Sequence, residues 1–236
     1  MFSALDIVIV AVSLSDVPEK WDVKEIPFYC HTEGYDPNIR GHDNNDINRL
    51  TYLTKRYNSA VTSAIEKFRE LKPTHILLCE KYYVKNVEGI ERLLKDYRVM
   101  GEDNAVMGAS IWCKIKVRIR PFIIYYDTLS VRELRGIKYY GGSRLPKGLM
   151  RVSGVGCCWI FPLDVWRNSG GFTIPIDEPQ AGGSRCLSAA PRPVFLDCSA
   201  RFWRTPADSD VPEYSLSKRL RVSAGGLKRK LISSCR

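Results

Sequence analysis

Short continuous runs of apolar residues recur along the chain, and these runs predict buried strands. Residues 6–14 read Asp-Ile-Val-Ile-Val-Ala-Val-Ser-Leu, without alternation of polar and apolar positions. Such a run is typical of a strand covered on both faces, as in a parallel sheet with helices on each side. We therefore expect this strand at the centre of the sheet. Further strands are predicted at 25–31, 75–79, 104–114, 119–127, 155–161 and 193–198.

A second pattern, with apolar residues three and four positions apart, predicts amphipathic helices. The first begins at Ile47, with Asn45 or Asp46 as its N-cap, and continues until Pro73 ends it. Loop residues dominate the preceding segment 32–46, which is rich in Gly, Asn, Asp and Pro.

The second helix follows Asn86 as N-cap, and its apolar stripe recurs at helical spacing as far as Tyr97. We expect Glu88 and Arg92 to pair across one turn of it. The order strand, helix, strand, helix implies parallel crossovers. We therefore predict a single α/β domain with a mostly parallel central sheet flanked by helices.

The second half of the chain has a different texture. Residues 136–156 are rich in Gly, Lys, Arg and Ser, which predicts a long loop of the kind that is usually functional inside a compact domain. A strand at 155–161, a short helix at 163–168 and a Gly-Gly-Phe turn at 170–172 follow. The aromatic residues here, Trp159, Trp166 and Phe172, are expected in the core.

Charge adds one feature to this picture. The 236 residues carry 36 Lys and Arg against 26 Asp and Glu, a net charge of +10, which favours anionic partners. Seven basic residues against one acidic residue lie between Glu213 and Arg236. We therefore divide the chain into a domain at 1–212 and a basic tail at 213–236. The tail suits the surface of an anionic membrane, and a solvated tail is the alternative.

Targeting signals and cysteines point to the interior of the cell. No basic segment or small-residue cleavage site frames the apolar run near the start, and no apolar stretch reaches the roughly 18 residues of a membrane span. We expect a cytoplasmic protein, peripheral at the membrane if the tail binds there. The eight cysteines are scattered without a C-x-x-C pair, so most are expected to be buried apolar filler. One or two disulfides stay open for a hyperthermophilic source.

Several segments together resemble a known enzyme family. Residues 154–166, then Ser169-Gly-Gly-Phe172, then Asp177-Glu178 follow the order of GT-A glycosyltransferases of family 2 and its relatives. The first strand, the helix with Arg56-Tyr57-Asn58, and the strand ending in Glu80 fit the first half of that pattern. The resemblance spans roughly residues 5–204.

This resemblance implies transfer of a sugar, with inversion, from a nucleotide-sugar donor to an acceptor that is a glycan, a protein or a lipid-linked molecule. It assigns the general base to Asp177 and Glu178. It puts Glu80, Lys81 and Tyr82 beside the donor, where the family has its Asp-x-Asp motif, and Arg56 and Asn58 on the adjacent helix. An exposed acidic turn is the structural alternative for Asp177 and Glu178. A solvated helix face is the alternative for Arg56 and Asn58.

The expected metal site departs from the family pattern. Only the first carboxylate, Glu80, is present, Lys81 follows it, and Tyr82 replaces the second carboxylate. The late histidine that often completes the site is replaced by residues 200–204, Ala-Arg-Phe-Trp-Arg. Because Mg²⁺ and Mn²⁺ prefer several oxygen ligands, we expect weak or absent metal dependence, with Glu80 as the single metal ligand and Lys81 neutralising the diphosphate.

Three other functions stay open. Basic residues beside aromatic ones at 138–140 and 201–204 would suit a nucleic-acid-binding protein. A nucleotidyltransferase would use a similar sheet, but no Gly-rich phosphate loop follows the first strand, where Ser13-Leu-Ser-Asp16 stands. A non-catalytic GT-A domain would explain the missing second carboxylate.

Overall fold

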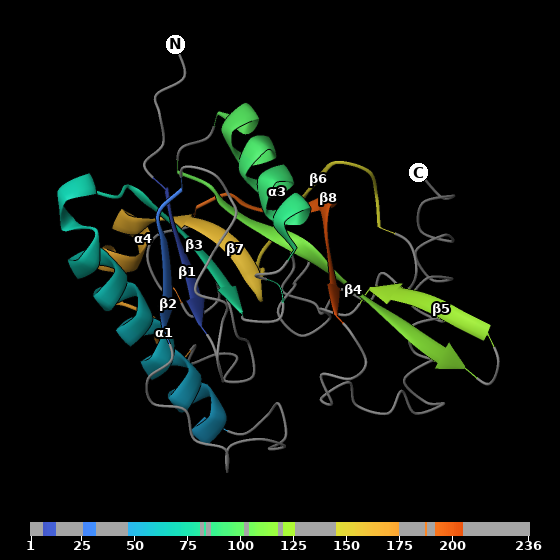
Figure 1. Cartoon of the computed structure of the whole chain (residues 1–236), viewed down its shortest axis with the longest axis horizontal. Helices are drawn as coiled ribbons and strands as arrows, with labels where there is room; N and C mark the ends of the chain where they lie inside the picture. Colours follow the sequence, from blue (N-terminus) through green and yellow to red (C-terminus); the bar gives the residue numbers. More distant parts are fainter. Residues whose placement is uncertain are drawn as a thin grey trace.

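A computed structural model describes the residues 7–12, 26–31, 47–80, 83, 86–101, 104–117, 120–125, 145–174, 187 and 192–204. All strands of this part belong to one mixed sheet, and helices lie on both of its faces (Figure 1). The strands are β1 (Ile7–Val12), β2 (Phe28–His31), β3 (His75–Glu80), β4 (Val106–Val117), β5 (Arg120–Tyr125), β6 (Leu149–Val152), β7 (Cys158–Pro162) and β8 (Val194–Arg204). The helices are α1 (Ile47–Lys67), the short 3-10 helix η2 (Arg69–Leu71), α3 (Val87–Met100) and α4 (Leu163–Asn168).

The sheet is mixed rather than mostly parallel, which corrects our expectation. Its order is β2-β1-β3-β7-β4-β8-β6, with β5 paired to β4. Three of the described pairs are parallel, namely β1 with β2, β1 with β3, and β4 with β8. The other four are antiparallel. The physical reason is the position of β7, which runs in the opposite direction between β3 and β4 and so replaces one parallel contact by two antiparallel ones.

The first strand, β1, lies second from the edge of the sheet and not at its centre. Val8 and Val10 pack in the cluster that contains α1, whereas Ile7, Ile9 and Ala11 pack in the cluster that contains α3. Cover on both faces requires only a neighbouring strand on each side and a helix above and below. The continuous apolar run therefore identifies an interior strand, without saying how far from the edge it lies.

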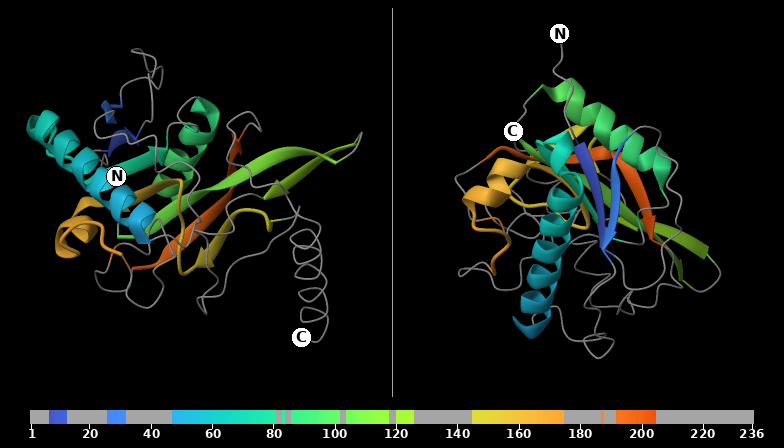
Figure 2. Two further views of the ribbon diagram at one scale, coloured as in Figure 1. Left: turned by 90° about the horizontal axis from the view of Figure 1, so that it is seen from below. Right: turned by 60° about the vertical axis from the view of Figure 1, so that its left-hand side comes forward.

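Helices α1 and α3 cover opposite faces of the sheet, as two views show (Figure 2). Small residues let α1 approach closely: Ala60, Val61 and Ala64 are fully buried against one face. Larger side chains of α3, among them Ile90, Leu93 and Tyr97, are buried against the other face. The predicted three-layer α/β architecture is confirmed at this level.

Helix α3 begins as predicted, and α1 does not end where expected. The Asn86 side chain accepts a hydrogen bond from the Gly89 N–H, as an N-cap residue does. The ion pair on α3 joins Arg92 to Asp96, at 2.7 Å, instead of to Glu88. Helix α1 stops at Lys67, and the tighter turn η2 carries the chain onward. Leu71, the last residue of the predicted stripe, is half exposed, so no core contact extends the α-helix to Pro73.

The predicted long loop at 136–156 contains a strand. β6 (Leu149–Val152) pairs with β8 at the edge of the sheet. Exposed residues alternate with more buried ones along it, so no continuous apolar run marks this strand in the sequence. Residues 126–144 lie outside the described part, as do the tail at 213–236 and the caps Asn45 and Asp46 of α1. The strands β4 and β5 form a hairpin whose far end extends away from α1 (Figure 1).

Among the described residues, none of the helices combines the length and the apolar composition that crossing a bilayer requires.

Candidate functional site

Glu80 marks an edge of the sheet where parallel strands end together. It is the last residue of β3, and the parallel register pairs it with Val12, the last residue of β1. Open α/β sheets bind ligands outside the carboxyl ends of such strands. Glu80 is half buried there.

Helix α1 supplies a hydrogen-bond donor to this carboxylate. The Tyr57 hydroxyl donates to Oε1 of Glu80 across 3.1 Å. The same tyrosine ring meets Phe172 edge to face, with the ring centroids 5.8 Å apart. Tyr57 was not among the predicted site residues, because a tyrosine in the apolar stripe of a helix gives no signal beyond that of a core residue.

The next residue of α1, Asn58, holds the Gly-Gly-Phe turn. Its Oδ1 accepts from the Phe172 N–H at 2.6 Å and from the Trp166 indole N–H at 3.0 Å. Its Nδ2 donates to the Phe172 carbonyl at 2.9 Å. Both ends of the amide are therefore used within the protein, and they fasten the turn to α1.

Two glycines allow the turn to lie close to Asn58, and we call this set of hydrogen bonds of Asn58 with Phe172 and Trp166 the clamp. Gly170 and Gly171 have φ angles of 69° and 92°, which favour glycine. A Cβ atom on Gly171 would lie only 2.7 Å from Oδ1 of Asn58. The turn then directs Phe172 into the core, where Trp159 and Phe161 contact it edge-on, each with centroids 5.8 Å away. Trp159 and Phe172 are core residues, as predicted.

Arg56, the residue before Tyr57 on α1, is enclosed by the protein. Its side chain is 4% exposed, and its guanidinium lies over the Tyr52 ring at 5.7 Å from the centroid. A cation this deeply buried and stacked is held by the protein itself. Three consecutive residues of α1 therefore have different neighbours. Arg56 lies over Tyr52, Tyr57 binds Glu80, and Asn58 binds Phe172.

A tight turn of unusual backbone geometry adjoins Glu80 on β7. Cys157 has φ of 63°, and the Cys158 N–H donates to the Gly156 carbonyl at 2.7 Å, which closes a three-residue γ-turn. The Cys157 carbonyl in turn accepts from the Glu80 N–H at 2.9 Å. Positive φ at a non-glycine residue costs about 1–3 kcal/mol and is concentrated at functional sites. No feature of the sequence had indicated this turn.

Four of the predicted site residues lie outside the described part of the chain. These are Lys81 and Tyr82, which follow Glu80, and Asp177 and Glu178, which follow the last described residue of the turn segment, Ile174. Within the described residues, no group of three or more His, Cys, Asp or Glu side chains is placed to hold a metal ion. In that part of the chain Glu80 therefore does not belong to a set of metal ligands.

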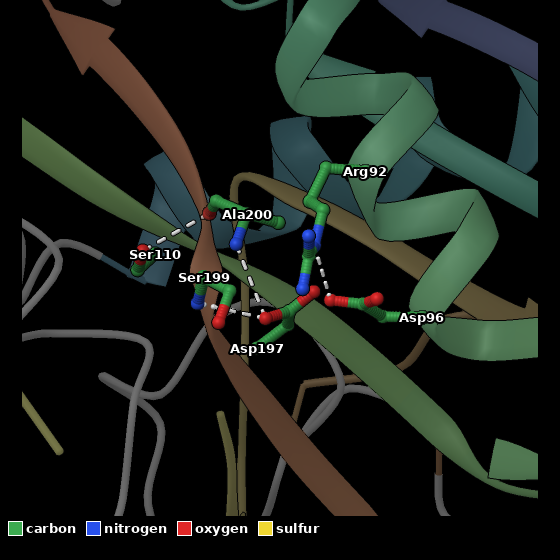
Figure 3. Close-up of polar contacts among 6 residues, drawn as sticks. All are labelled: Arg92, Asp96, Ser110, Asp197, Ser199 and Ala200. Carbon is green, nitrogen blue, oxygen red and sulfur yellow. Dashed lines mark hydrogen bonds and ion pairs between the residues drawn. The ribbon is translucent and has the colours of Figure 1, made fainter. Parts of the chain in front are cut away.

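A second polar cluster joins α3 to β8 (Figure 3). Asp197 is fully buried, and its Oδ1 accepts from the Ser199 and Ala200 N–H groups at 2.8 and 3.1 Å. These bonds hold a bulge, since the register of β8 against β4 shifts after Asp197. Burial raises the pKa of Asp197 to about 6, although the backbone hydrogen bonds from Ser199 and Ala200 lower it; nearby Asp96 adds a smaller upward contribution. Sequence analysis did not single out this carboxylate.

Comparison with models of protein families and with curated proteins of known function finds no match for this chain.

Proposed function

We propose that the chain is a glycosyltransferase domain of the GT-A type, similar to family 2, which binds a nucleotide-sugar at the sheet edge marked by Glu80. The observation that carries the proposal is the parallel pairing of β1 with β3, which brings Val12 and Glu80 to one edge. Ligands of open α/β folds bind at this kind of edge.

The order of elements after β6 supports the same proposal. Strand β7, helix α4 and the turn at Gly170 and Gly171 follow one another as in the family pattern that the sequence resembles. Asn58 ties that turn to α1, and the neighbouring Tyr57 binds Glu80. One helix therefore connects the strand-end carboxylate with the segment that leads to the acidic pair.

In the proposed reaction, Asp177 or Glu178 takes the proton of the acceptor hydroxyl while its oxygen attacks the anomeric carbon of the donor. The bond to the nucleoside diphosphate breaks on the opposite side, which inverts the configuration. General-base catalysis of this kind is commonly worth about 10²–10⁴-fold. Glu80 accepts hydrogen bonds from the ribose or lies at the diphosphate end, and Lys81 neutralises charge on the leaving diphosphate.

A divalent ion held at Glu80, as GT-A enzymes often use, would stabilise the negative charge of the leaving diphosphate. Mg²⁺ or Mn²⁺ would need several oxygen ligands. Glu80 supplies one carboxylate, which accepts a hydrogen bond from Tyr57, and among the described residues no group of three or more His, Cys, Asp or Glu side chains is placed to hold an ion. This donor set does not fit a metal site, so the reaction is written without a metal, and weak or absent metal dependence is proposed.

The acceptor is a glycan, a protein or a lipid-linked molecule. The basic tail at 213–236 would bring the enzyme to an anionic membrane, where a lipid-linked acceptor is found. Vesicles with and without anionic lipid, tested with the full chain and with a chain ending at 212, would measure this contribution directly.

Thermal-shift measurements with UDP-, GDP- and TDP-sugars test the proposal. We expect one nucleotide class to raise the melting temperature both in EDTA and with Mn²⁺, because a ligand that binds only the folded state stabilises it. Stabilisation that disappears in EDTA and returns only with Mn²⁺ would contradict the metal-independent site. Failure of every donor, together with salt-dependent RNA binding, would favour the nucleic-acid-binding function instead.

A non-catalytic nucleotide-sugar-binding domain is the second candidate. The observation in its favour is that Lys81 and Tyr82 follow Glu80 where the family has a second carboxylate. Incubation of the protein with its stabilising donor distinguishes the two. Release of nucleoside diphosphate, with or without added acceptor, supports the enzyme, whereas binding without any release supports the second candidate.

A further inference from the structure

Two cysteines face each other across neighbouring strands directly beneath the edge that carries Glu80. Cys79 on β3 and Cys158 on β7 are partners in the antiparallel register. They are adjacent to Glu80 and to the γ-turn at Cys157, respectively. Both are fully buried, and both belong to the cluster on the α3 face of the sheet, so their side chains lie on the same side.

The hydrogen bonds of this ladder define how close the two cysteines are. The Glu80 N–H donates to the Cys157 carbonyl, and the Leu163 N–H donates to the Thr74 carbonyl, at 2.9 and 2.8 Å. In an antiparallel ladder, hydrogen-bonded and non-hydrogen-bonded pairs alternate. Counting inward from both bonds makes Cys79 and Cys158 a non-hydrogen-bonded pair. Such pairs have Cα atoms about 4.5 Å apart, within the roughly 4.4–6.8 Å that a disulfide spans.

The Cys158 thiol is also close enough to Cys79 to affect its ionisation. Burial first, and then a hydrogen bond with the Cys158 thiol, raise the pKa of the Cys79 thiol well above its ordinary value. The same environment keeps Cys79 protonated at neutral pH, so its reaction is limited by the small fraction of thiolate.

We propose that Cys79 and Cys158 form a dithiol pair that closes to a cross-strand disulfide with a small two-electron thiol oxidant of the diazene or disulfide class. With a diazene, one thiolate adds to the N=N bond. The second thiolate then attacks the bound sulfur and displaces the hydrazide. Each thiol loses one proton, the two sulfurs together lose two electrons, and the N=N bond becomes HN–NH.

This bond would act on the candidate site through the backbone. It joins β3 and β7 one residue before Glu80 and one residue after Cys157, whose carbonyl binds the Glu80 N–H. The closed form therefore fixes the end of the ladder on which the carboxylate stands. The proposal does not depend on the glycosyltransferase function, because it concerns the two thiols alone.

The test uses the full chain in its native state and diamide as the diazene. After oxidation, free thiols are alkylated in denaturant and the protein is digested with trypsin without reduction. We expect peptide 70–81, which contains Cys79, linked to peptide 152–167, which contains both Cys157 and Cys158. The link should disappear on reduction with dithiothreitol and should form faster at pH 8.5 than at pH 7, because thiolate is the attacking species.

Three alanine variants assign the bond. Cys157→Ala leaves one cysteine in peptide 152–167, so a link that persists in this variant joins Cys79 to Cys158. Cys158→Ala should abolish the link. Cys198→Ala is the matched control and should keep it, since Cys198 is equally buried but packs in the cluster on the other face.

Oxidised wild-type protein should melt roughly 5–10 °C above the reduced protein, because the bond closes a long loop in the unfolded chain. Complete alkylation of both cysteines after prolonged oxidation would overturn the proposal. So would a link that survives in Cys158→Ala or is lost in Cys157→Ala. If Cys158→Ala fails to fold, the wild-type and Cys157→Ala maps alone still decide between these outcomes.

Discussion

Replacement of Asp197 by asparagine should make the protein more stable at neutral pH, although Asp197 is fully buried and holds a bulge. Asparagine keeps the oxygen that accepts from the Ser199 and Ala200 N–H groups. It removes only the negative charge, which burial disfavours. The substitution thus measures the free-energy cost of the buried negative charge while the hydrogen bonds to Ser199 and Ala200 are kept.

The size and the pH range follow from the pKa of Asp197, which rises from 3.8 to about 6 on folding. A carboxyl with a raised pKa binds its proton more tightly in the folded state. Its contribution is therefore complete below about pH 4 and is lost as the pH rises through 6. A shift of this size corresponds to about 2–3 kcal/mol at 1.36 kcal/mol for each pKa unit.

Urea unfolding of both proteins between pH 4 and pH 8, at constant ionic strength, measures this effect. We expect the variant and the wild type to have similar stability at pH 4. The variant should exceed the wild type by about 2–3 kcal/mol at pH 7. Asp164→Asn is the control, because Asp164 forms an exposed pair with Arg192 and should change stability by less than about 1 kcal/mol at any pH. A variant that becomes less stable than the wild type as the pH rises would show that the ionised Asp197 stabilises the fold and would refute this reasoning.

Four further predictions concern the clamp and the proposed site. Gly171→Ala should lower the free energy of unfolding by about 2–4 kcal/mol, because the added Cβ atom would meet Asn58. Gly170→Ala should lower it by only about 1–2 kcal/mol, because the space around Gly170 is open. Equal losses in urea unfolding would contradict the close contact between the turn and Asn58. Asn58→Leu leaves buried groups of Phe172 and Trp166 without partners and should accelerate amide hydrogen exchange at 170–174. Tyr57→Phe should weaken nucleoside diphosphate binding by less than tenfold in titration calorimetry, because it removes one hydrogen bond to Glu80; an unchanged affinity would separate Tyr57 from the site. Glu178→Gln should lower turnover about 10²–10⁴-fold with donor binding nearly intact, and wild-type rates in this variant would remove Glu178 as the base.

The elements with strong local signals could be predicted from the sequence. The apolar run of β3, the N-cap Asn86 and the succession of β7, α4 and the glycine turn all agree with the structure. The direction of β7 could not be predicted, because a run of apolar residues looks the same in a parallel and in an antiparallel strand. Strand β6 was missed because one face of it is exposed at the edge of the sheet.

The contacts of the site were harder to predict, because they join distant parts of the chain. Asn58 and Phe172 are 114 positions apart, and Tyr57 and Glu80 are 23 apart. The pattern of α1 showed that Tyr57 faces the sheet, but not which group it would meet. The location of Glu80 at the edge of the sheet could be predicted from the sequence, because a polar residue that follows a buried apolar strand lies where that strand ends.

Titration calorimetry of the wild type and Glu80→Gln with UDP, GDP and TDP, each in EDTA, tests the central claim most directly. The account predicts that one of these nucleotides binds the wild type, and that the variant binds it about tenfold or more weakly, as the loss of one charged hydrogen-bond acceptor implies. The melting temperature of the variant should stay close to that of the wild type, because Glu80 is only half buried. Equal affinities in the two proteins, or no binding of any of the three nucleotides to the wild type, would contradict the account.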